Sequence, residues 1–116
     1  MTATFADYVA QQDARNTIQL NVTKWTLMLC DALRDAAPGG YDYIIESGRK
    51  YHKIIMIDSG KGRSVHAFVD RKTGQVYKSA SWKSPAKGVR YDLRLIEQRE
   101  WLLENADWAG GYLYAK

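Results

Sequence analysis

The spacing of the apolar residues changes at the tripeptide Pro38-Gly39-Gly40, and this change constrains the fold more than any other feature. Before the tripeptide, apolar residues recur at every third or fourth position, which lines one face of a helix. After it, short runs rich in β-branched and aromatic residues are separated by glycine-containing turns, a pattern typical of strands joined by hairpins. Proline cannot continue the helical hydrogen-bond ladder, and glycine tolerates the turn that follows. The chain is therefore predicted to be α+β, with helices before residue 40 and a sheet after it.

Two helices are predicted before the tripeptide. The first is short, with Thr4 as its N-cap and Asp7 three residues later, which is the spacing of a capping box. The second begins at Asn16 or Thr17, because both residue types can cap a helix. Its apolar face repeats at steps of three and four and consists of Ile18, Val22, Trp25, Leu29, Leu33 and Ala36. This face is expected to pack on the sheet.

Four strands and a last helix are predicted after the tripeptide. The strands are expected at residues 41–46, 50–57, 64–69 and 75–78. Short loops join them, which indicates an antiparallel meander. A loop at 79–90 follows, and the last helix begins near Asp92, with Tyr91 packing on Ile96 as a hydrophobic staple. The predicted fold is two N-terminal helices, a four-stranded antiparallel meander and one C-terminal helix, in a single domain over residues 1–116.

Basic residues are concentrated in the predicted sheet and the loop after it. From Arg49 to Arg90 there are eleven basic and two acidic residues, a net charge of +9, whereas the rest of the chain holds six basic and eleven acidic residues, or −5. Dense lysine and arginine side chains neutralise phosphates and release condensed counterions. The segment therefore predicts a surface that binds DNA or RNA. The predicted nucleic-acid-binding residues are Arg49, Lys50, Lys53, Arg63, Tyr77, Lys78, Trp82, Lys83, Lys87 and Arg90.

Two aromatic residues of this set indicate a preference for single strands. Tyr77 and Trp82 stand among the basic residues, and aromatic rings stack on unpaired bases at ~1–3 kcal/mol each. The alternative for both rings is a structural one, in which they seal the 79–90 loop onto the sheet. The alternative for the basic segment is a solvated face. The register of the hairpins decides which of these residues face outward, because a slip of one residue exchanges the two faces of a sheet.

The C-terminal end carries many aromatic residues and predicts a second kind of surface. Aromatic residues are enriched in the cores of protein interfaces. The predicted interface residues are Trp101, Trp108, Tyr112 and Tyr114. Acidic residues gather towards both ends of the chain, so opposite charges favour either a homo-oligomer or docking to a host protein. The alternative is that the C-terminal tail folds back and completes the core.

The sequence offers no set of residues for catalysis or for holding a metal, so neither an enzyme nor a cofactor is expected. Cys30 lies on an apolar helical face without a neighbouring base, which predicts a buried thiol. The turn at 58–62 lacks the glycine and lysine spacing of a nucleotide phosphate loop. His52 and His66 lie on neighbouring predicted strands without the close spacing of a metal site. Both histidines are expected on the sheet surface or half-buried.

No membrane segment is expected, and the chain is predicted to be intracellular. The longest mostly apolar stretch, residues 25–33, is too short to span a bilayer and contains Asp31. No basic region followed by an apolar run stands at the N-terminus, so a signal peptide is not predicted.

A composite of short motifs runs through residues 43–93. It consists of Gly48-Arg-Lys-Tyr51, Lys53-Ile54, Ser64-Val-His66, Phe68-Val-Asp70, Thr73-Gly74, Val76-Tyr-Lys78, Trp82-Lys83, Pro85-Ala-Lys87 and Val89-Arg-Tyr91. This composite resembles a group of small uncharacterised proteins encoded by tailed bacteriophages. The resemblance implies a phage origin and an accessory role in the cytoplasm of the infected bacterial host, and it supplies no catalytic residues. Three functions are therefore expected in order: nucleic-acid binding, modulation of a bacterial host protein, and a minor structural role in the virion.

Overall fold

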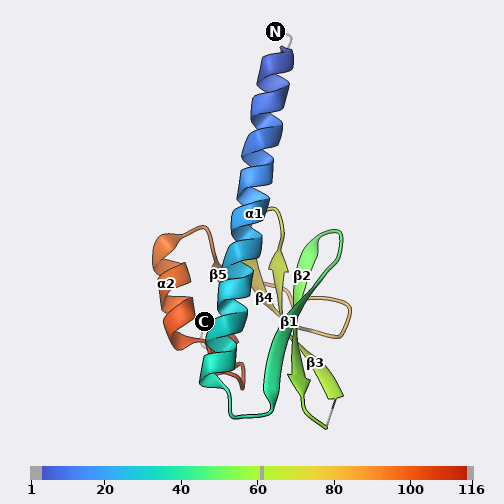
Figure 1. Ribbon diagram of the computed structural model, residues 1–116, viewed down its shortest axis with the longest axis vertical. Coiled ribbons are helices and arrows are strands. Elements are labelled where there is room, and N and C mark those ends of the chain that lie inside the picture. The colour runs from blue at the N-terminus through green and yellow to red at the C-terminus, as the bar shows by residue number, and fades with distance from the viewer. Residues whose placement is uncertain (1–3, 61, 115–116) are drawn as a thin grey trace.

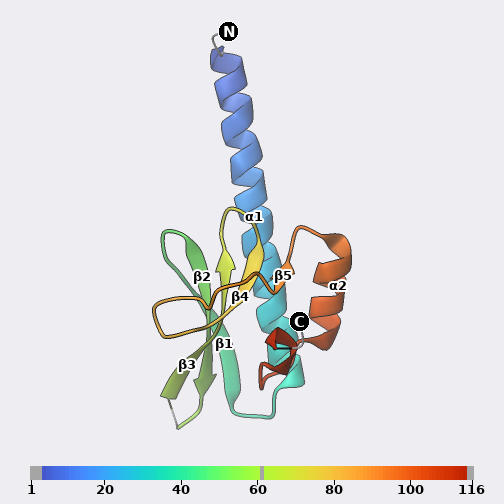
Figure 2. The same cartoon turned by 180° about the vertical axis from the view of Figure 1, so that it is seen from behind.

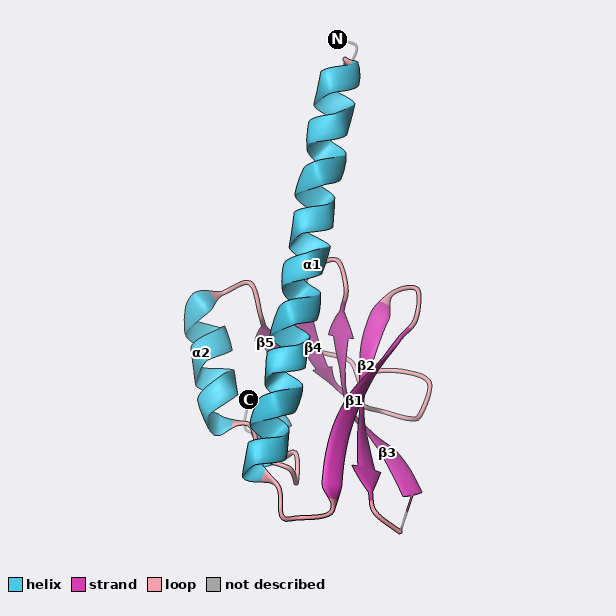
Figure 3. Cartoon of the chain, in the orientation of Figure 1, coloured by secondary structure: helices cyan, strands magenta, loops and turns pink. Residues whose placement is uncertain are grey.

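The computed structural model describes residues 4–60 and 62–114, and it has an α+β architecture (Figures 1 and 3). A long helix, α1 (Phe5–Ala36), precedes an antiparallel sheet whose five strands follow one another in chain order. The strands are β1 (Tyr41–Ser47), β2 (Tyr51–Asp58), β3 (Gly62–Asp70), β4 (Gln75–Lys78) and β5 (Tyr91–Asp92). Helix α2 (Ile96–Asn105) and the short 3-10 helix η1 (Gly111–Leu113) follow the sheet. The predicted fold class and the antiparallel meander are confirmed.

The two predicted N-terminal helices are one continuous helix, so their separation is wrong. The predicted capping box is present, since the Asp7 amide donates to Thr4 Oγ1 at 3.1 Å and the Thr4 amide donates to Asp7 Oδ2 at 3.2 Å. At the expected break, the Thr17 hydroxyl instead donates to the Asp13 carbonyl one turn earlier, at 2.9 Å. No glycine or proline lies between residues 5 and 36 to interrupt the hydrogen-bond ladder.

The N-terminal half of α1 projects beyond the sheet, whereas its C-terminal half packs on it (Figure 1). The buried residues of the helix all lie in the second half and are Val22, Thr26, Leu29, Cys30 and Leu33. In the projecting half, Phe5 is 82% exposed and Tyr8 is also exposed. The projection makes the molecule elongated, with extents of 57 × 27 × 25 Å.

One face of the sheet, called the inner face, packs on α1. Strand pairing aligns Tyr43 with Met56, Ile54 with Ala67, and Val69 with Val76 across four strands. Tyr43, Ile54, Ala67, Val69 and Val76 join Leu29 and Leu33 of α1 in one core cluster. Helix α2 closes the side of this core, and its Arg99 guanidinium lies 4.2 Å from the ring centre of Trp25. The predicted apolar face of the second helix is thus confirmed from Val22 to Leu33.

The opposite, outer face of the sheet is crossed by the 79–90 loop (Figure 2). Ile55 and Phe68 point away from α1 and are nevertheless buried, on the face that this loop crosses (Figure 2). The loop is not entirely irregular, since the Arg90 amide donates to the Val76 carbonyl at 2.7 Å and Tyr91 pairs with Val76. The four-stranded prediction therefore lacked a fifth strand, β5.

The predicted start of the last helix is also wrong. Asp92 belongs to β5, and α2 begins at Ile96. The proposed staple between Tyr91 and Ile96 does not form, because Ile96 is 60% exposed and Tyr91 instead stacks on Trp101 with ring centres 5.4 Å apart. The pairing of β5 with β4 fixes Tyr91 on the inner face, where its ring belongs to the core.

Gly74 ends the tight turn between β3 and β4 and has a positive φ of 75°. Its amide donates to the Asp70 carbonyl at 2.9 Å, and a Cβ at this position would lie 3.4 Å from a Val22 methyl carbon. Both the backbone conformation and the close approach of α1 favour glycine here.

In the part of the chain that the structure describes, no helix combines the length and the apolar character needed to cross a membrane.

Candidate nucleic-acid interface

Strand register places a row of side chains across the outer face of the sheet. Lys53 on β2 is opposite Phe68 on β3, and Phe68 is opposite Tyr77 on β4. Neighbouring His52 reaches Thr23 of α1, with Oγ1 and Nε2 3.0 Å apart, so alternation along β2 directs Lys53 away from the helix. The ring of Tyr51 meets both Phe68 and Tyr77 edge-on, at centre distances of 5.7 and 6.1 Å. The row therefore forms an aromatic base beneath Lys53.

The 79–90 loop brings Trp82 onto this base. The Ser79 hydroxyl donates to the Val65 carbonyl at 3.1 Å, which ties the start of the loop to β3. The Ala80 amide donates to the Ser84 carbonyl at 3.0 Å and closes the tip. The Trp82 ring then lies with its centre 5.0 Å from Lys53 Nζ and 5.9 Å from Arg63 Cζ, and it stays 43% exposed. The loop therefore holds a partly exposed indole with two cations beside it.

Four cations converge on a shallow pocket next to Trp82. Arg49, Lys50, Lys53 and Lys83 line this pocket of about 220 Å³, together with Glu46 and the backbone of the β1–β2 turn. Glu46 Oε2 is 3.4 Å from Arg63 Nη2, so its charge is shared with that arginine. These groups form what we call the outer basic surface, which consists of Arg49, Lys50, Lys53, Arg63, Tyr77, Trp82 and Lys83.

Three residues of the predicted nucleic-acid set do not join the outer basic surface. Lys78 lies on the inner face, with Nζ 4.1 Å from the ring centre of Tyr114. Arg90 is half-buried beside β4, where its Nε atom has no hydrogen-bond partner among the described residues. Lys87 is exposed on the return arm of the loop and is not among the residues that line the pocket. Lys61, another base of the +9 segment, lies outside the described residues.

The four residues of the predicted protein interface also differ in exposure. Tyr112 is buried, and its side chain reaches His66, with the hydroxyl 2.7 Å from Nε2. For this residue the burial favours the alternative, in which the C-terminal tail completes the core. Trp101, Trp108 and Tyr114 remain exposed. Trp108 packs on Tyr41 with ring centres 5.1 Å apart.

Both histidines face inward: His52 is buried, against the expectation, whereas His66 is half-buried as expected. Burial lowers the pKa of His66 to about 4, and the nearby Asp107 carboxylate opposes this shift only in part. Burial also lowers the pKa of His52, whose Nδ1 lies 2.6 Å from the Ser47 hydroxyl. Within residues 4–60 and 62–114, no group of three or more histidine, cysteine or acidic side chains is arranged to hold a metal ion.

The single thiol is buried as predicted. Cys30 is in the core cluster, and burial raises its pKa to about 11. A thiol that stays protonated at neutral pH is a poor nucleophile. The same burial raises the pKa of Tyr43, on the facing strand, to about 12.

Sequence reasoning missed the supporting role of Tyr51 and Phe68. A signal for Tyr51 was available, because Tyr51 and Lys53 are two positions apart on one strand and therefore share a face. Predicting the role of Phe68 required knowledge of how β2 and β3 pair. That pairing contains a shift of register between Ile54 and Ile55. A strand with such an irregularity exchanges faces partway along its length.

A family model described as a family of unknown function, DUF7717, matches residues 5–115. The match begins with α1 and covers nearly the whole chain, so the protein belongs to this family. Comparison with the curated proteins and with the solved structures gives no match.

Proposed function

We propose that this member of the DUF7717 family binds nucleic acid through the outer basic surface, with a preference for single strands and little preference for sequence. The observation that carries the proposal is the position of Trp82 beside Lys53 and Arg63. A partly exposed indole next to cations combines the two groups that single-strand binding uses, a ring for stacking on bases and charges for the phosphates. The four cations around the neighbouring pocket extend this surface.

The proposal includes a phage origin and an accessory role in the cytoplasm of the infected bacterial host. The resemblance over residues 43–93 supports it, and the outer basic surface is made largely of residues from those motifs. Its groups are cations and stacking rings, which suit binding rather than catalysis.

Fluorescence anisotropy tests the proposal directly. The full chain is titrated into labelled single-stranded DNA, duplex DNA and single-stranded RNA at two salt concentrations. We expect the tightest binding to one of the single strands and a slope of log affinity against log salt of about −3, from roughly four phosphate contacts at −0.7 each. Binding that ignores salt, or no binding at low salt, would contradict the proposal.

Lys83 and Lys87 provide a matched pair within one loop. Lys83 lines the pocket of the outer basic surface, whereas Lys87 is exposed and does not line it. We expect Lys83→Glu to weaken single-strand binding by about tenfold, and Lys87→Glu to weaken it only by the smaller effect of net charge. Equal effects of the two substitutions would mean that only net charge matters.

A second candidate function is modulation of a bacterial host protein. It is favoured by the exposed rings of Trp101, Trp108 and Tyr114, because aromatic side chains anchor protein interfaces. A pull-down from nuclease-treated host lysate should then return a stoichiometric protein, and Trp101→Ala should release it. A minor structural role in the virion is a third proposal, and the absence of the chain from purified particles would remove it.

A further inference from the structure

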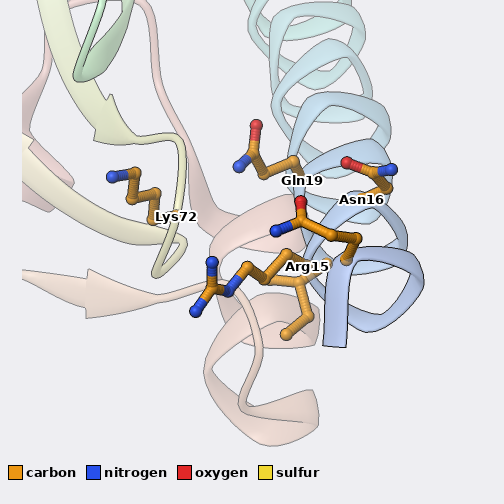
Figure 4. A pocket seen from close by; sticks show the side chains of 6 residues that line it. Arg15, Asn16, Gln19 and Lys72 are labelled. Atoms are coloured by element: carbon orange, nitrogen blue, oxygen red, sulfur yellow. The ribbon is translucent and has the colours of Figure 1, made fainter. Parts of the chain in front are cut away.

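A crevice lies where α1 leaves the body of the molecule, between the helix and the turn that joins β3 to β4 (Figure 4). Its volume is about 570 Å³, within the range of ligand pockets. Its lining is Gln12, Arg15, Asn16, Ile18, Gln19 and Lys72. A second hollow of about 340 Å³ shares Asn16 and Gln19 with the first and adds Arg71. Among the described residues that line the two hollows, three are cationic and none is acidic.

The polar groups of the crevice are available to a ligand. Among the described residues, the side chains of Gln12, Arg15, Asn16, Gln19 and Lys72 make no hydrogen bond or ion pair with the rest of the chain. Figure 4 shows Lys72 on the turn and Arg15, Asn16 and Gln19 on the helix across from it. An anionic ligand placed between the two elements would therefore meet cations from both sides.

The three amides share one face of the helix. Gln12, Asn16 and Gln19 are spaced four and three residues apart, so they lie one above another. Each amide offers both a donor and an acceptor, a pair that matches the hydrogen-bonding edge of a base. Ile18, at the same crevice, adds apolar surface. This combination suits a nucleotide better than an acidic peptide, whose carboxylates need donors only.

The crevice is structurally continuous with the outer basic surface. The Arg71 amide donates to the Lys50 carbonyl at 2.9 Å, and Arg71 Nη1 donates to the Gly48 carbonyl at 2.6 Å. These bonds fix the β3–β4 turn against the β1–β2 turn, which carries Arg49 and Lys50. Cations therefore continue from the outer face, over this end of the sheet, to α1.

We infer that the crevice is a second binding site for the same single strand, an inference that rests on the proposed function. The strand lies with its bases against Trp82 at the outer basic surface and crosses the end of the sheet. At the crevice, Arg15 and Lys72 hold its phosphates, and the amides of α1 hydrogen-bond to base edges. The projecting half of α1 is thus a wall of the binding site.

A length series of single-stranded oligonucleotides tests this arrangement by fluorescence anisotropy. Strands of about 6 nucleotides fill only the outer basic surface, and strands of about 20 reach both sites. We compare the wild-type chain with the double variant Arg15→Ala/Lys72→Ala and with the control Lys24→Ala/Lys87→Ala, which removes the same charge from exposed positions elsewhere. Thermal unfolding followed by circular dichroism verifies that all three chains are folded.

We expect the crevice variant to bind the long strand about tenfold more weakly and to reduce its salt slope by about 1.4, from two lost phosphate contacts. Its affinity for the short strand should stay close to that of the wild type, and the control should lose only the small effect of net charge on the long strand. A further variant, Gln12→Ala/Asn16→Ala, should reduce the difference in affinity between long oligo-dA and oligo-dT.

The outcomes separate the two proposals. If the wild type binds strands but the crevice variant matches it at both lengths, the crevice inference is overturned and the outer basic surface stands. If the wild type binds no strand of any length, the proposed function falls and the inference falls with it. If the variant keeps its affinity but loses a dimer in light scattering, the crevice is an interface between copies of the chain and the inference is wrong.

Discussion

The two faces of the sheet carry similar side chains, but different elements pack against them. On the inner face, α1, α2 and η1 pack against the strands, and half-buried His66 reaches the hydroxyl of Tyr112 in the core. On the outer face, which one loop crosses (Figure 2), Ile55 and Phe68 are buried, whereas most of the basic residues are exposed. Each face has a lysine over an aromatic ring, Lys78 over Tyr114 and Lys53 over Trp82.

The difference shows that neighbours, more than residue type, make a candidate binding site. The pocket beside Tyr114 has Lys78 as the only cation in its described lining, whereas four cations line the pocket beside Lys53. A dense group of cations repels itself unless an anion or solvent neutralises it. In our proposal a polyanion neutralises the outer face, whereas the inner face is covered by the packing of the helices.

The largest expected effect concerns the inner face. Leu29 is fully buried beneath the sheet, and Leu27, two residues earlier on α1, is about half exposed. We expect Leu29→Ala to lower the free energy of unfolding by about 4 kcal/mol, because it leaves a cavity in the core. The matched Leu27→Ala should cost less than about 0.5 kcal/mol. Urea unfolding measures both, and similar losses would contradict the assignment of the inner face.

The pH dependence of stability is a second test of the difference between the inner and outer faces. Burial lowers the pKa of His66 to about 4, so below its unfolded pKa near 6.5 the unfolded chain binds more protons and folding weakens. Lowering the pH from about 7 to about 5 should remove about 2 kcal/mol, and the loss ends as the pH reaches the folded pKa. Tyr112, Tyr43 and Asp107 surround this imidazole.

His66→Gln keeps a polar group near the Tyr112 hydroxyl and removes the titration. The variant should therefore lose less stability between these two pH values than the wild type. Equal pH profiles of the two proteins in urea unfolding would show that another group controls the acid sensitivity. Nucleic-acid affinity, which depends on the outer face, should be the same for both proteins at neutral pH.

The two lysine–aromatic pairs provide the next comparison. Trp82→Ala should weaken single-strand binding by about 1.5 kcal/mol, or about tenfold, because a stacking ring is lost. Tyr114 is 64% exposed on the other face, and Tyr114→Ala should leave the affinity unchanged. Anisotropy titrations measure both. If Tyr114→Ala weakened binding as much as Trp82→Ala, our proposal would have placed the nucleic-acid strand on the wrong face of the sheet.

The smallest expected effect is at β1, the edge strand where the two faces meet. Arg34 Nη2 donates to the outward Tyr43 carbonyl at 2.6 Å, and its Nε contacts Asp42 Oδ1 at 2.6 Å. Asp42 in turn accepts from the Tyr43 amide at 2.8 Å. Together these side chains occupy the free edge, a protection against pairing with other chains.

Arg34→Ala should therefore lower stability by only about 1 kcal/mol and promote concentration-dependent self-association. Arg94→Ala is the control, because Arg94 pairs with Asp92 away from this edge. Sedimentation velocity at rising concentration follows both variants. Equal behaviour of the two would mean that the edge needs no such protection.

Much of the fold could be predicted because its determinants are local in sequence. The change of period at Pro38-Gly39-Gly40, the capping box at Thr4 and the buried face of α1 depend on residues within a few turns of one another. The continuous α1 was missed because Asn16 and Thr17 are good caps, although neither breaks a helix. Strand β5 was missed because two residues carry no periodicity of their own, and pairing with β4 alone defines them.

The sequence by itself determined the fold class, the uneven charge and the residue types of the candidate site. The tertiary structure decided which of those residues meet. It placed Lys53, Arg63 and Trp82 together and sent Lys78 to the other face, because one residue of register exchanges the faces of a strand. It also carried the β3–β4 turn to α1, bringing Lys72 opposite Arg15 across more than fifty residues of chain. Such contacts depend on the path of the whole backbone, so no local sequence pattern predicts them.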